Sequence, residues 1–172
     1  TTITKASAVG GGSVTWDGGV AVTARGIVWS TSPNPTTALA TKTNHGGGSL
    51  AFTSNLSGLK PSTTYYVRAY AINSQGTGYG NEVTFTTLPD APVLSQVTLS
   101  DMTLSSITGS ASITSDGGVE ISARGLVWNT TGNPTVDNNV VPAGNGSGDS
   151  HATLTGLTEG SVYYVRAYAT NS

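Results

Sequence analysis

The chain of 172 residues repeats long stretches of its own sequence, and this repetition limits the possible folds more than any other feature. The motif Asp-Gly-Gly-Val at 17–20 with Ala-Arg-Gly-Ile-Val-Trp at 24–29 returns about 99 residues later, at 116–128. A second motif, Tyr-Tyr-Val-Arg-Ala-Tyr-Ala, occurs at 65–71 and again at 163–169. The period is longer than most solenoid units and close to one small domain. The sequence therefore predicts two tandem copies of one domain.

The composition predicts an all-β fold. Charged residues make up only 9% of the chain, whereas Gly, Thr, Ser and Asn are abundant and Val, Ile and Tyr recur. This mixture favours short strands and many turns over helices. A copy of this length is close to the ~100 residues of an immunoglobulin-like β-sandwich. There is no cysteine, which excludes a disulfide framework and thiolate chemistry.

Several classes of function are not expected. A net charge of −2 with seven Lys and Arg residues leaves no basic stripe for nucleic acid. The sequence lacks an apolar run of ~18 residues, so we expect no insertion into a membrane. The two histidines, His45 and His151, are not at equivalent positions, and no serine lies in a nucleophile-elbow motif. We therefore expect neither an enzyme nor a cofactor.

Alternation and turn residues place the strands of the second copy. Residues 93–99 are expected to form a first strand, and the alternating residues 107, 109, 111 and 113 a second. Asp116 precedes two glycines, which supply the positive φ of a tight turn. We therefore expect 119–128 to return antiparallel beside the second strand, and the same around Asp17. Both aspartates are interpreted as turn formers, because their side chains can bond the turn backbone.

The predicted domains are 1–88 and 93–172, joined by a linker at 89–92 that two prolines stiffen. Such a linker predicts domains arranged end to end with limited swing. When the copies are aligned, the first lacks a counterpart of residues 93–99 and the second lacks a counterpart of residues 82–87. Two explanations are open: the chain is a window from a longer array of repeats, or neighbouring chains supply the missing strands.

The residues around the Tyr-Tyr-Val-Arg motif resemble a known family. Leu59, Pro61, Thr63 and Tyr65 precede alternating residues that end at Asn73, which is similar to the E–F corner and F strand of fibronectin type III domains. The second copy repeats this from Leu157 to Asn171, but Glu159 and Ser161 replace the proline and the threonine. The resemblance implies two tandem fibronectin type III or immunoglobulin-like β-sandwiches. It also implies that Tyr65 and Tyr163 are tyrosine-corner residues, and it places Trp16 where this family often has a second-strand tryptophan.

The Arg-Gly-Ile-Val-Trp and Asn-Pro elements resemble the fibronectin-type repeats of very large Bacteroidota surface proteins, including gliding-motility adhesins. This resemblance implies an extracellular location on the bacterial cell surface and a role in attachment or gliding motility. The expected partners are neighbouring repeats of the same chain and surface polysaccharides or other glycans. One alternative is a spacer or carbohydrate-binding module of a secreted polysaccharide-degrading enzyme. Another is a strand-exchanged subunit of an extracellular filament.

Aromatic and arginine residues form the candidate ligand face. If Tyr65 and Val67 face the core, alternation places the intervening side chains on the outer face. An adjacent strand could add an arginine and a tryptophan beside them, although 27 and 29 could instead point inward. The candidates are Tyr66, Arg68, Tyr70, Arg25 and Trp29 in the first copy and Tyr164, Arg166, Tyr168, Arg124 and Trp128 in the second. Such a face could bind sugars, or it could simply stabilise the sheet through cross-strand pairs.

Acidic and amide side chains offer a narrower prediction, a calcium site. The loop residues Asp137, Asn138, Asn139, Asn145 and Asp149 carry the oxygen ligands that Ca²⁺ prefers, but they lack the spacing of an EF-hand. A flexible polar loop is the alternative interpretation. Asp90 in the linker could also join Asp101 to hold a calcium ion between the domains.

Overall fold

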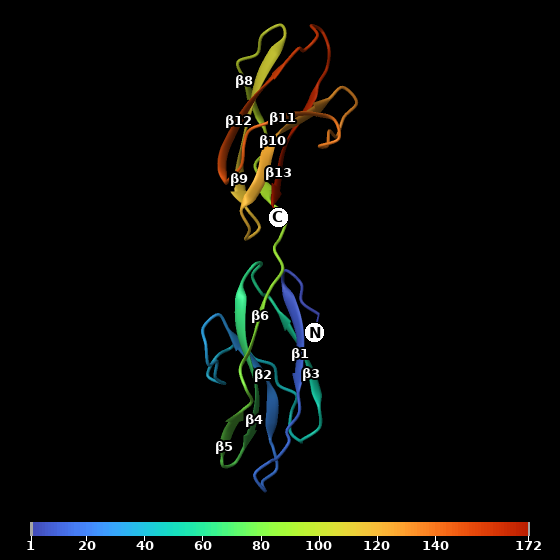
Figure 1. The fold of residues 1–172 in the computed structure, drawn as a ribbon. Helices are drawn as coiled ribbons and strands as arrows, with labels where there is room; N and C mark the ends of the chain where they lie inside the picture. The colour runs from blue at the N-terminus through green and yellow to red at the C-terminus, as the bar shows by residue number, and fades with distance from the viewer. Residues whose placement is uncertain (1, 172) are drawn as a thin grey trace. The chain divides into compact units, whose positions relative to one another are not determined.

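Residues 2–171 are described by the structure, a computed structural model, and they form strands, turns and no helix. The prediction of an all-β fold is therefore confirmed. The chain divides into two compact units, of which the first ends at Pro89 and the second begins at Asp90 (Figure 1). The outer limits of the two predicted domains, residues 1 and 172, lie outside the described residues.

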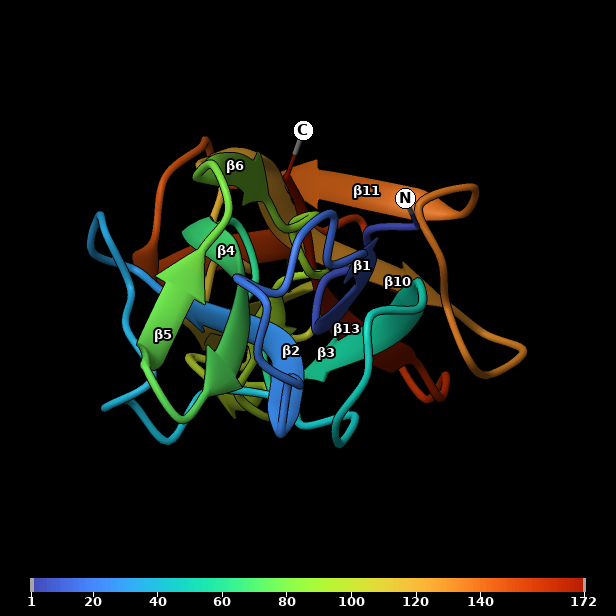
Figure 2. The ribbon, with the colours of Figure 1, turned by 90° about the horizontal axis from the view of Figure 1, so that it is seen from below.

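Unit 1 contains two antiparallel sheets. The smaller sheet pairs β1 (Ser7–Gly12) with β3 (Phe52–Ser57). The larger sheet consists of β2 (Ala24–Ser30), β4 (Thr64–Asn73), β5 (Gly76–Tyr79) and β6 (Val83–Thr86). In this sheet β4 is central, because β2 pairs with one edge while β5 and β6 share the other. Figure 2 shows β1 beside β3, with β2, β4 and β5 to their left in the view.

Unit 2 also contains two antiparallel sheets. The first consists of β7 (Val93–Leu94), β8 (Thr98–Ser100), β9 (Ser106–Ser115) and β12 (Gly148–Thr155). The second consists of β10 (Ile121–Asn129), β11 (Asn139–Pro142) and β13 (Tyr164–Asn171). Here β9 is central in one sheet and β10 in the other. Among residues 2–171, β13 pairs with no strand except β10.

Each unit buries a core between its two sheets. In unit 1, Ala8 and Leu56 from one sheet meet Ile27 and Val67 from the other. In unit 2, Leu126 of β10 meets Ala152 and Leu154 of β12, and further apolar side chains pack around them. These residues follow the period of two that directs alternate side chains of a strand to one face. Each unit is therefore a β-sandwich, built from residues that recur at equivalent positions.

The Asp-Gly-Gly segments are turns, but the predicted hairpins across them are wrong. Strand β9 pairs with β7, β8 and β12, whereas β10 pairs with β11 and β13, so the turn at 116–118 connects two different sheets. The turn at 17–19 likewise connects β1 to β2 without pairing them. Gly18, Gly19, Gly117 and Gly118 all have positive φ. Positive φ at a turn thus changes the chain direction without determining which strand becomes the neighbour.

Both turns are fastened in the same way. The Asp17 carboxylate accepts a hydrogen bond from the backbone N–H of Gly19 (2.9 Å), and Asp116 does the same for Gly118 (2.8 Å). The amide of Asn73, the last residue of β4, donates to the backbone carbonyl of Asp17 (2.8 Å). The interpretation of the two aspartates as turn formers agrees with this geometry.

The predicted strand at 93–99 is interrupted. It consists of the short strands β7 and β8 with Ser95, Gln96 and Val97 between them. The predicted linker residues are held by backbone hydrogen bonds within their own units. Leu88 bonds to Thr4 and Ser62 in unit 1, and the N–H of Asp90 donates to Gly117 in unit 2 (2.9 Å). Only Pro89 lies between these two attachments.

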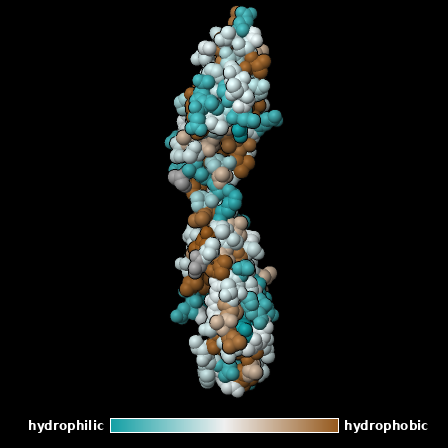
Figure 3. Space-filling model, turned by 90° about the vertical axis from the view of Figure 1, so that its right-hand side faces the viewer, coloured by the Kyte–Doolittle hydropathy of each residue, from teal (hydrophilic) through white to brown (hydrophobic). Residues whose placement is uncertain are grey.

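The surface matches the composition. Figure 3 shows pale side chains of intermediate hydropathy over much of the visible face, with hydrophilic and apolar patches among them. The abundant Ser, Thr and Gly residues account for the pale areas. Several large apolar side chains are nevertheless exposed, and Trp16 is the most exposed of them, at 81%.

Candidate ligand-binding face

The outer face of the larger sheet in unit 1 carries the alternate residues of β4. Tyr65 and Val67 belong to the core, so Tyr66, Arg68 and Tyr70 lie on the opposite side of the strand. Tyr66 and Arg68 are partly exposed. The period of two therefore places these three side chains on the predicted face, but their accessibility differs.

Tyr70 is not available to a ligand, because it is only 4% exposed. Its ring lies over Gly26 of the neighbouring strand, and its hydroxyl donates to the backbone carbonyl of Thr43 (2.6 Å). Burial raises the pKa of the Tyr70 hydroxyl. Tyr168 in unit 2 lies over Gly125 in the same way and is half-buried. At both glycines a side chain would collide with a backbone carbonyl, of Thr43 or Val141, and with the tyrosine ring, so only glycine fits there.

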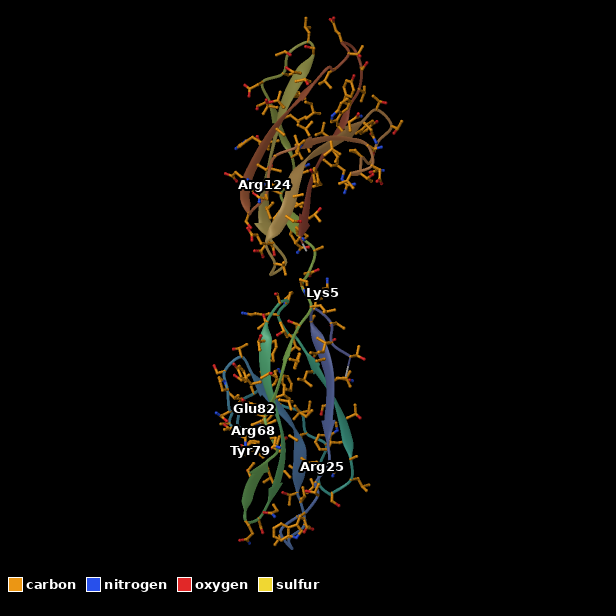
Figure 4. The ribbon with its side chains drawn as sticks, viewed as in Figure 1. Lys5, Arg25, Arg68, Tyr79, Glu82 and Arg124 are labelled. Carbon is orange, nitrogen blue, oxygen red and sulfur yellow. The ribbon has the colours of Figure 1, made fainter. Side chains whose placement is uncertain are left out.

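The Arg68 side chain packs on the ring of Tyr79, which is not among the predicted residues of the ligand face. The Arg68 guanidinium carbon lies 4.4 Å from the centre of the Tyr79 ring, and its Nε donates to the carbonyl of Gly80 (3.2 Å) (Figure 4). The Tyr79 hydroxyl accepts a hydrogen bond from the backbone N–H of Thr37 (2.9 Å), which lowers its pKa. Arg68 and Tyr79 thus attach the loop around Thr37 to the sheet.

The predicted tryptophans face inward in both units. Trp29 is 8% exposed and belongs to the core with Ile27 and Tyr65. Trp128 packs against the core of unit 2, edge-on to Tyr163 with 5.3 Å between ring centres. Trp29 lies two residues after the core residue Ile27, and Trp128 lies two residues after the core residue Leu126, so each shares the inward face of its strand. The inclusion of Trp29 and Trp128 in an exposed ligand face is therefore wrong.

The predicted arginines of β2 and β10 do not lie on the outer face either. Arg25 is two residues before Ile27, so its side chain lies on the same face of the strand. Its guanidinium carbon lies 5.8 Å from the centre of the Phe52 ring, and Nη1 donates a hydrogen bond to the carbonyl of Gly47. Arg124 donates to the carbonyls of Ala143 (3.3 Å), Ser147 (3.1 Å) and Gly148 (3.3 Å). Each arginine therefore anchors the glycine-rich loop of its own unit. Arg25 and Arg124 do not lie beside Arg68 and Arg166, since their side chains leave the opposite face of the sheet.

The remaining accessible pair is in unit 2. Tyr164 is 47% exposed and Arg166 is exposed, and both lie on the outer side of β13. Arg166 makes one long hydrogen bond, to the carbonyl of Pro134 (3.5 Å). Of the ten predicted residues, Tyr164 and Arg166 are the two that are exposed, and the others are partly or fully buried.

The two predicted corner tyrosines make equivalent hydrogen bonds. The hydroxyl of Tyr65 accepts from the backbone N–H of Lys60, and that of Tyr163 accepts from Thr158, each at 2.9 Å and five residues upstream. The bond from Thr158 lowers the pKa of Tyr163. The arrangement is kept although Glu159 and Ser161 replace the proline and the threonine of the first copy, so the corner depends on the tyrosine and the backbone.

The predicted calcium ligands are dispersed. Asp149 accepts from Ser112 on the neighbouring strand (2.5 Å), and Asp137 accepts from Thr135 within its own loop (3.4 Å). Asp101 accepts from Ser100 (2.9 Å), and Asp90 from the N–H of Ala91 (2.8 Å). Among the described residues, no three His, Asp or Glu side chains gather where they could hold a metal ion. The positions of these side chains therefore do not support a calcium site.

Trp16 also departs from its expected place. The family resemblance puts it on the second strand, but β1 ends at Gly12 and Trp16 lies in the following loop. In unit 2 the equivalent Ser115 still belongs to β9, where it pairs with Val93 of β7. The longer β9 is supported by β7, and β1 has no corresponding strand among the described residues.

Neither models of known protein families nor curated proteins gave a match to the chain. The part of the chain that the structure describes has no helix of sufficient length and hydropathy to cross a membrane. The chemistry of the described faces is therefore the basis for a functional proposal.

Proposed function

We propose that the chain is a structural and adhesive segment of a long, secreted bacterial surface protein built from fibronectin type III-like repeats. The observation that carries the proposal is the repeated structural design. Both units use the Asp-Gly-Gly turn, the corner tyrosine and the loop-anchoring arginine in the same way. These recurring residues stabilise the fold of each unit, and a chain of repeated stable domains is suited to span a distance and display a surface.

The proposed contact face is the outer side of β13, with Tyr164 and Arg166 as its principal residues. An exposed tyrosine offers a flat apolar ring, and the guanidinium offers hydrogen-bond donors in a fixed fork. Hydroxyl-rich polymers such as polysaccharides can use both groups. The role in attachment or gliding motility, and the extracellular location, follow from this adhesive proposal and from the repeat resemblance.

Binding to polysaccharides tests the contact face. The whole chain is applied to immobilised bacterial surface and plant cell-wall polysaccharides, together with the double variant Tyr164→Ser/Arg166→Ser. The matched control is Thr108→Ala/Thr153→Ala, which removes an exposed hydroxyl pair from the other sheet of the same unit. We expect the first variant to lose binding and the control to retain it. Equal binding by both variants, or no binding by the parent chain, contradicts the proposed face.

The mass of the native polypeptide tests the proposed setting. Measured under denaturing conditions, a mass of hundreds of kilodaltons agrees with a long array of repeats. An intermediate mass with a non-repetitive domain favours a module of a secreted enzyme. A mass near the 17.3 kDa of this chain contradicts the long-array proposal and favours a filament subunit.

A further inference from the structure

The outer face of the β9–β12 pair in unit 2 carries a row of cross-strand polar pairs. Ser110 of β9 lies opposite His151 of β12, and a hydrogen bond joins the serine hydroxyl to the histidine Nδ1 (2.8 Å). Two residues along, the Ser112 hydroxyl donates to the Asp149 carboxylate (2.5 Å). These side chains point away from the core, because the residue between each pair of neighbours on a strand is buried. An imidazole and a carboxylate are thus held beside each other on the surface.

These pairs form one side of a polar hollow of about 240 Å³. The other side is the interruption between β7 and β8, where the hydroxyl of Ser95 accepts a hydrogen bond from the backbone N–H of Ser112 (2.9 Å). Gln96 follows in the interruption, and β8 then places Thr98 opposite Ser110. All of the lining residues lie between 95 and 151, so strands that pair with one another within the chain form the hollow.

Several polar atoms of the hollow are available to a ligand. Within residues 2–171, the Nε2 of His151 and the second carboxylate oxygen of Asp149 have no hydrogen-bond partner. The exposed Gln96 adds an amide, which carries two donors and an acceptor. A carboxylate only accepts hydrogen bonds, whereas a hydroxyl group both donates and accepts them. A ligand with neighbouring hydroxyl groups can therefore satisfy all three side chains.

Unit 1 does not carry these groups. When the copies are aligned on β3 and β12, Thr53 takes the place of His151 and Ala51 takes that of Asp149. On the neighbouring strand, Gly11 lies opposite Thr53, so the serine bonded to the imidazole is also replaced. The sandwich forms with either set of residues, whereas the turn, corner and loop-anchoring residues recur in both units. The imidazole and the carboxylate are therefore no part of the repeated scaffold.

The charge and size of the hollow limit its ligand. Among the described residues that line it, Asp149 is the only carboxylate, and there is no lysine or arginine. Such a lining disfavours phosphate and other anions, because like charges repel. The volume is below the ~300–1,000 Å³ of pockets that take drug-sized ligands. A neutral, hydroxyl-rich group of about one ring fits these limits.

We propose that this hollow binds one neutral sugar residue at the end of a glycan chain. Asp149 accepts a hydrogen bond from one ring hydroxyl, and His151 and Gln96 bond to the neighbouring hydroxyls. Ser110 and Ser112 are positioning residues that hold the imidazole and the carboxylate. The site deepens the proposed adhesive function and rests on it for its biological context. It lies on the sheet opposite the Tyr164 and Arg166 face, so the two contacts can be tested separately.

Neutral monosaccharides added to the whole chain test this site. The probes are glucose, galactose, mannose and N-acetylglucosamine, and binding is followed by the amide chemical shifts in NMR spectra. We expect saturable shifts in β9 and β12 with at least one of these sugars. The variant Asp149→Ala/His151→Thr introduces the residues that unit 1 has at these positions, so it should fold, which thermal unfolding checks. It should bind that sugar at least ~10-fold more weakly, because two hydrogen bonds are lost.

Two further variants separate this site from the proposed contact face. Tyr164→Ser/Arg166→Ser should keep its affinity for the monosaccharide, whatever it does to polysaccharide binding. Thr108→Ala/Thr153→Ala should also keep it, since this hydroxyl pair lies on the same strands outside the hollow.

Three outcomes overturn the sugar site. The first is that no sugar shifts the amides of β9 and β12, and the second is that Asp149→Ala/His151→Thr binds as tightly as the parent chain. The third is that EDTA abolishes binding, which would show that a metal ion bridges the sugar to the protein. None of these outcomes decides whether Tyr164 and Arg166 bind polysaccharides, so the proposed function stands or falls by its own test.

Discussion

The two units differ in how their identical Tyr-Tyr-Val-Arg strands are covered. In unit 1, β4 lies between β2 on one edge and β5 with β6 on the other, and its inward residues are buried. In unit 2, β13 pairs with β10 alone among the described residues, and the same residue types are partly exposed. The corner hydrogen bond is nevertheless the same in both units. The comparison separates a local feature, the corner, from burial, which depends on the neighbouring strand.

The largest expected effects come from the side chains at the centre of each sandwich. Leu56 and Leu154 are equivalent in position and almost fully buried. Each leucine-to-alanine substitution should lower the free energy of unfolding of its own unit by about 2–5 kcal/mol, through lost burial and the cavity left behind. Urea unfolding followed by tryptophan fluorescence checks this, because Trp29 lies in unit 1 and Trp128 in unit 2. A substitution that destabilises both units equally would show that the two cores are coupled.

The substitution Phe85→Ala should make unit 1 resemble unit 2. Phe85 is partly buried on Tyr65, so we expect the free energy of unfolding of unit 1 to fall by about 2 kcal/mol, less than for a fully buried aromatic residue. The exposure of Tyr65 should rise toward that of Tyr163, as measured by tyrosine accessibility to a chemical probe. Thr84→Ala, on the exposed side of the same strand, is the control. Equal effects of the two substitutions would mean that β6 acts through its backbone alone.

The corner hydroxyls should contribute unequally. In Tyr65→Phe the backbone N–H of Lys60 loses its acceptor next to a buried ring, which should cost about 1 kcal/mol of unfolding free energy. Tyr163→Phe should cost less, because water reaches the more exposed corner of unit 2. Thermal unfolding of both variants checks the order. The reverse order would show that the corner of unit 2 has a role beyond its hydrogen bond.

The smallest effect concerns the alkaline titration of the tyrosines. Burial raises the pKa of Tyr70, whereas hydrogen bonds from backbone N–H groups lower the pKa values of Tyr79 and Tyr163. The raised pKa means that stability from Tyr70 is present below its unfolded pKa and is lost as pH rises through its folded pKa. For Tyr79 and Tyr163 the stability is present above the unfolded pKa and is lost as pH falls through the folded pKa. In a spectrophotometric titration, Tyr70→Phe should remove a late step. Loss of an early step instead would contradict the assignment.

The sequence patterns predicted side-chain direction better than strand pairing. The alternation at Ile107, Ala111 and Ile113 corresponds to β9, and the glycines after Asp17 and Asp116 have the positive φ expected of turns. The hairpin prediction failed because a turn motif specifies local dihedral angles, while the core decides which strands become neighbours. The choice of sheet is a property of the whole sandwich, and no single motif encodes it.

The candidate face failed where alternation was not applied to both strands. Trp29 is two residues after Ile27, so the alternation of the strand already predicted that the Trp29 side chain points inward. Arg25 is two residues before Ile27, and the recurrence of an arginine together with a glycine-rich loop in both copies was a signal for their contact. The contact between Arg68 and Tyr79 had no such signal, because the given sequence does not reach the equivalent position of the second copy.

The asparagine that fastens each Asp-Gly-Gly turn has a consequence for how the units fold. Asn73 bonds to Asp17 across 56 residues of chain, and Asn171 bonds to Asp116 across 55. The turn is therefore completed only when the last strand of the motif arrives, late in the sequence. Contacts this distant slow the search for the native state and make its parts form together. Each unit should accordingly fold more slowly than a domain of the same size whose contacts are local.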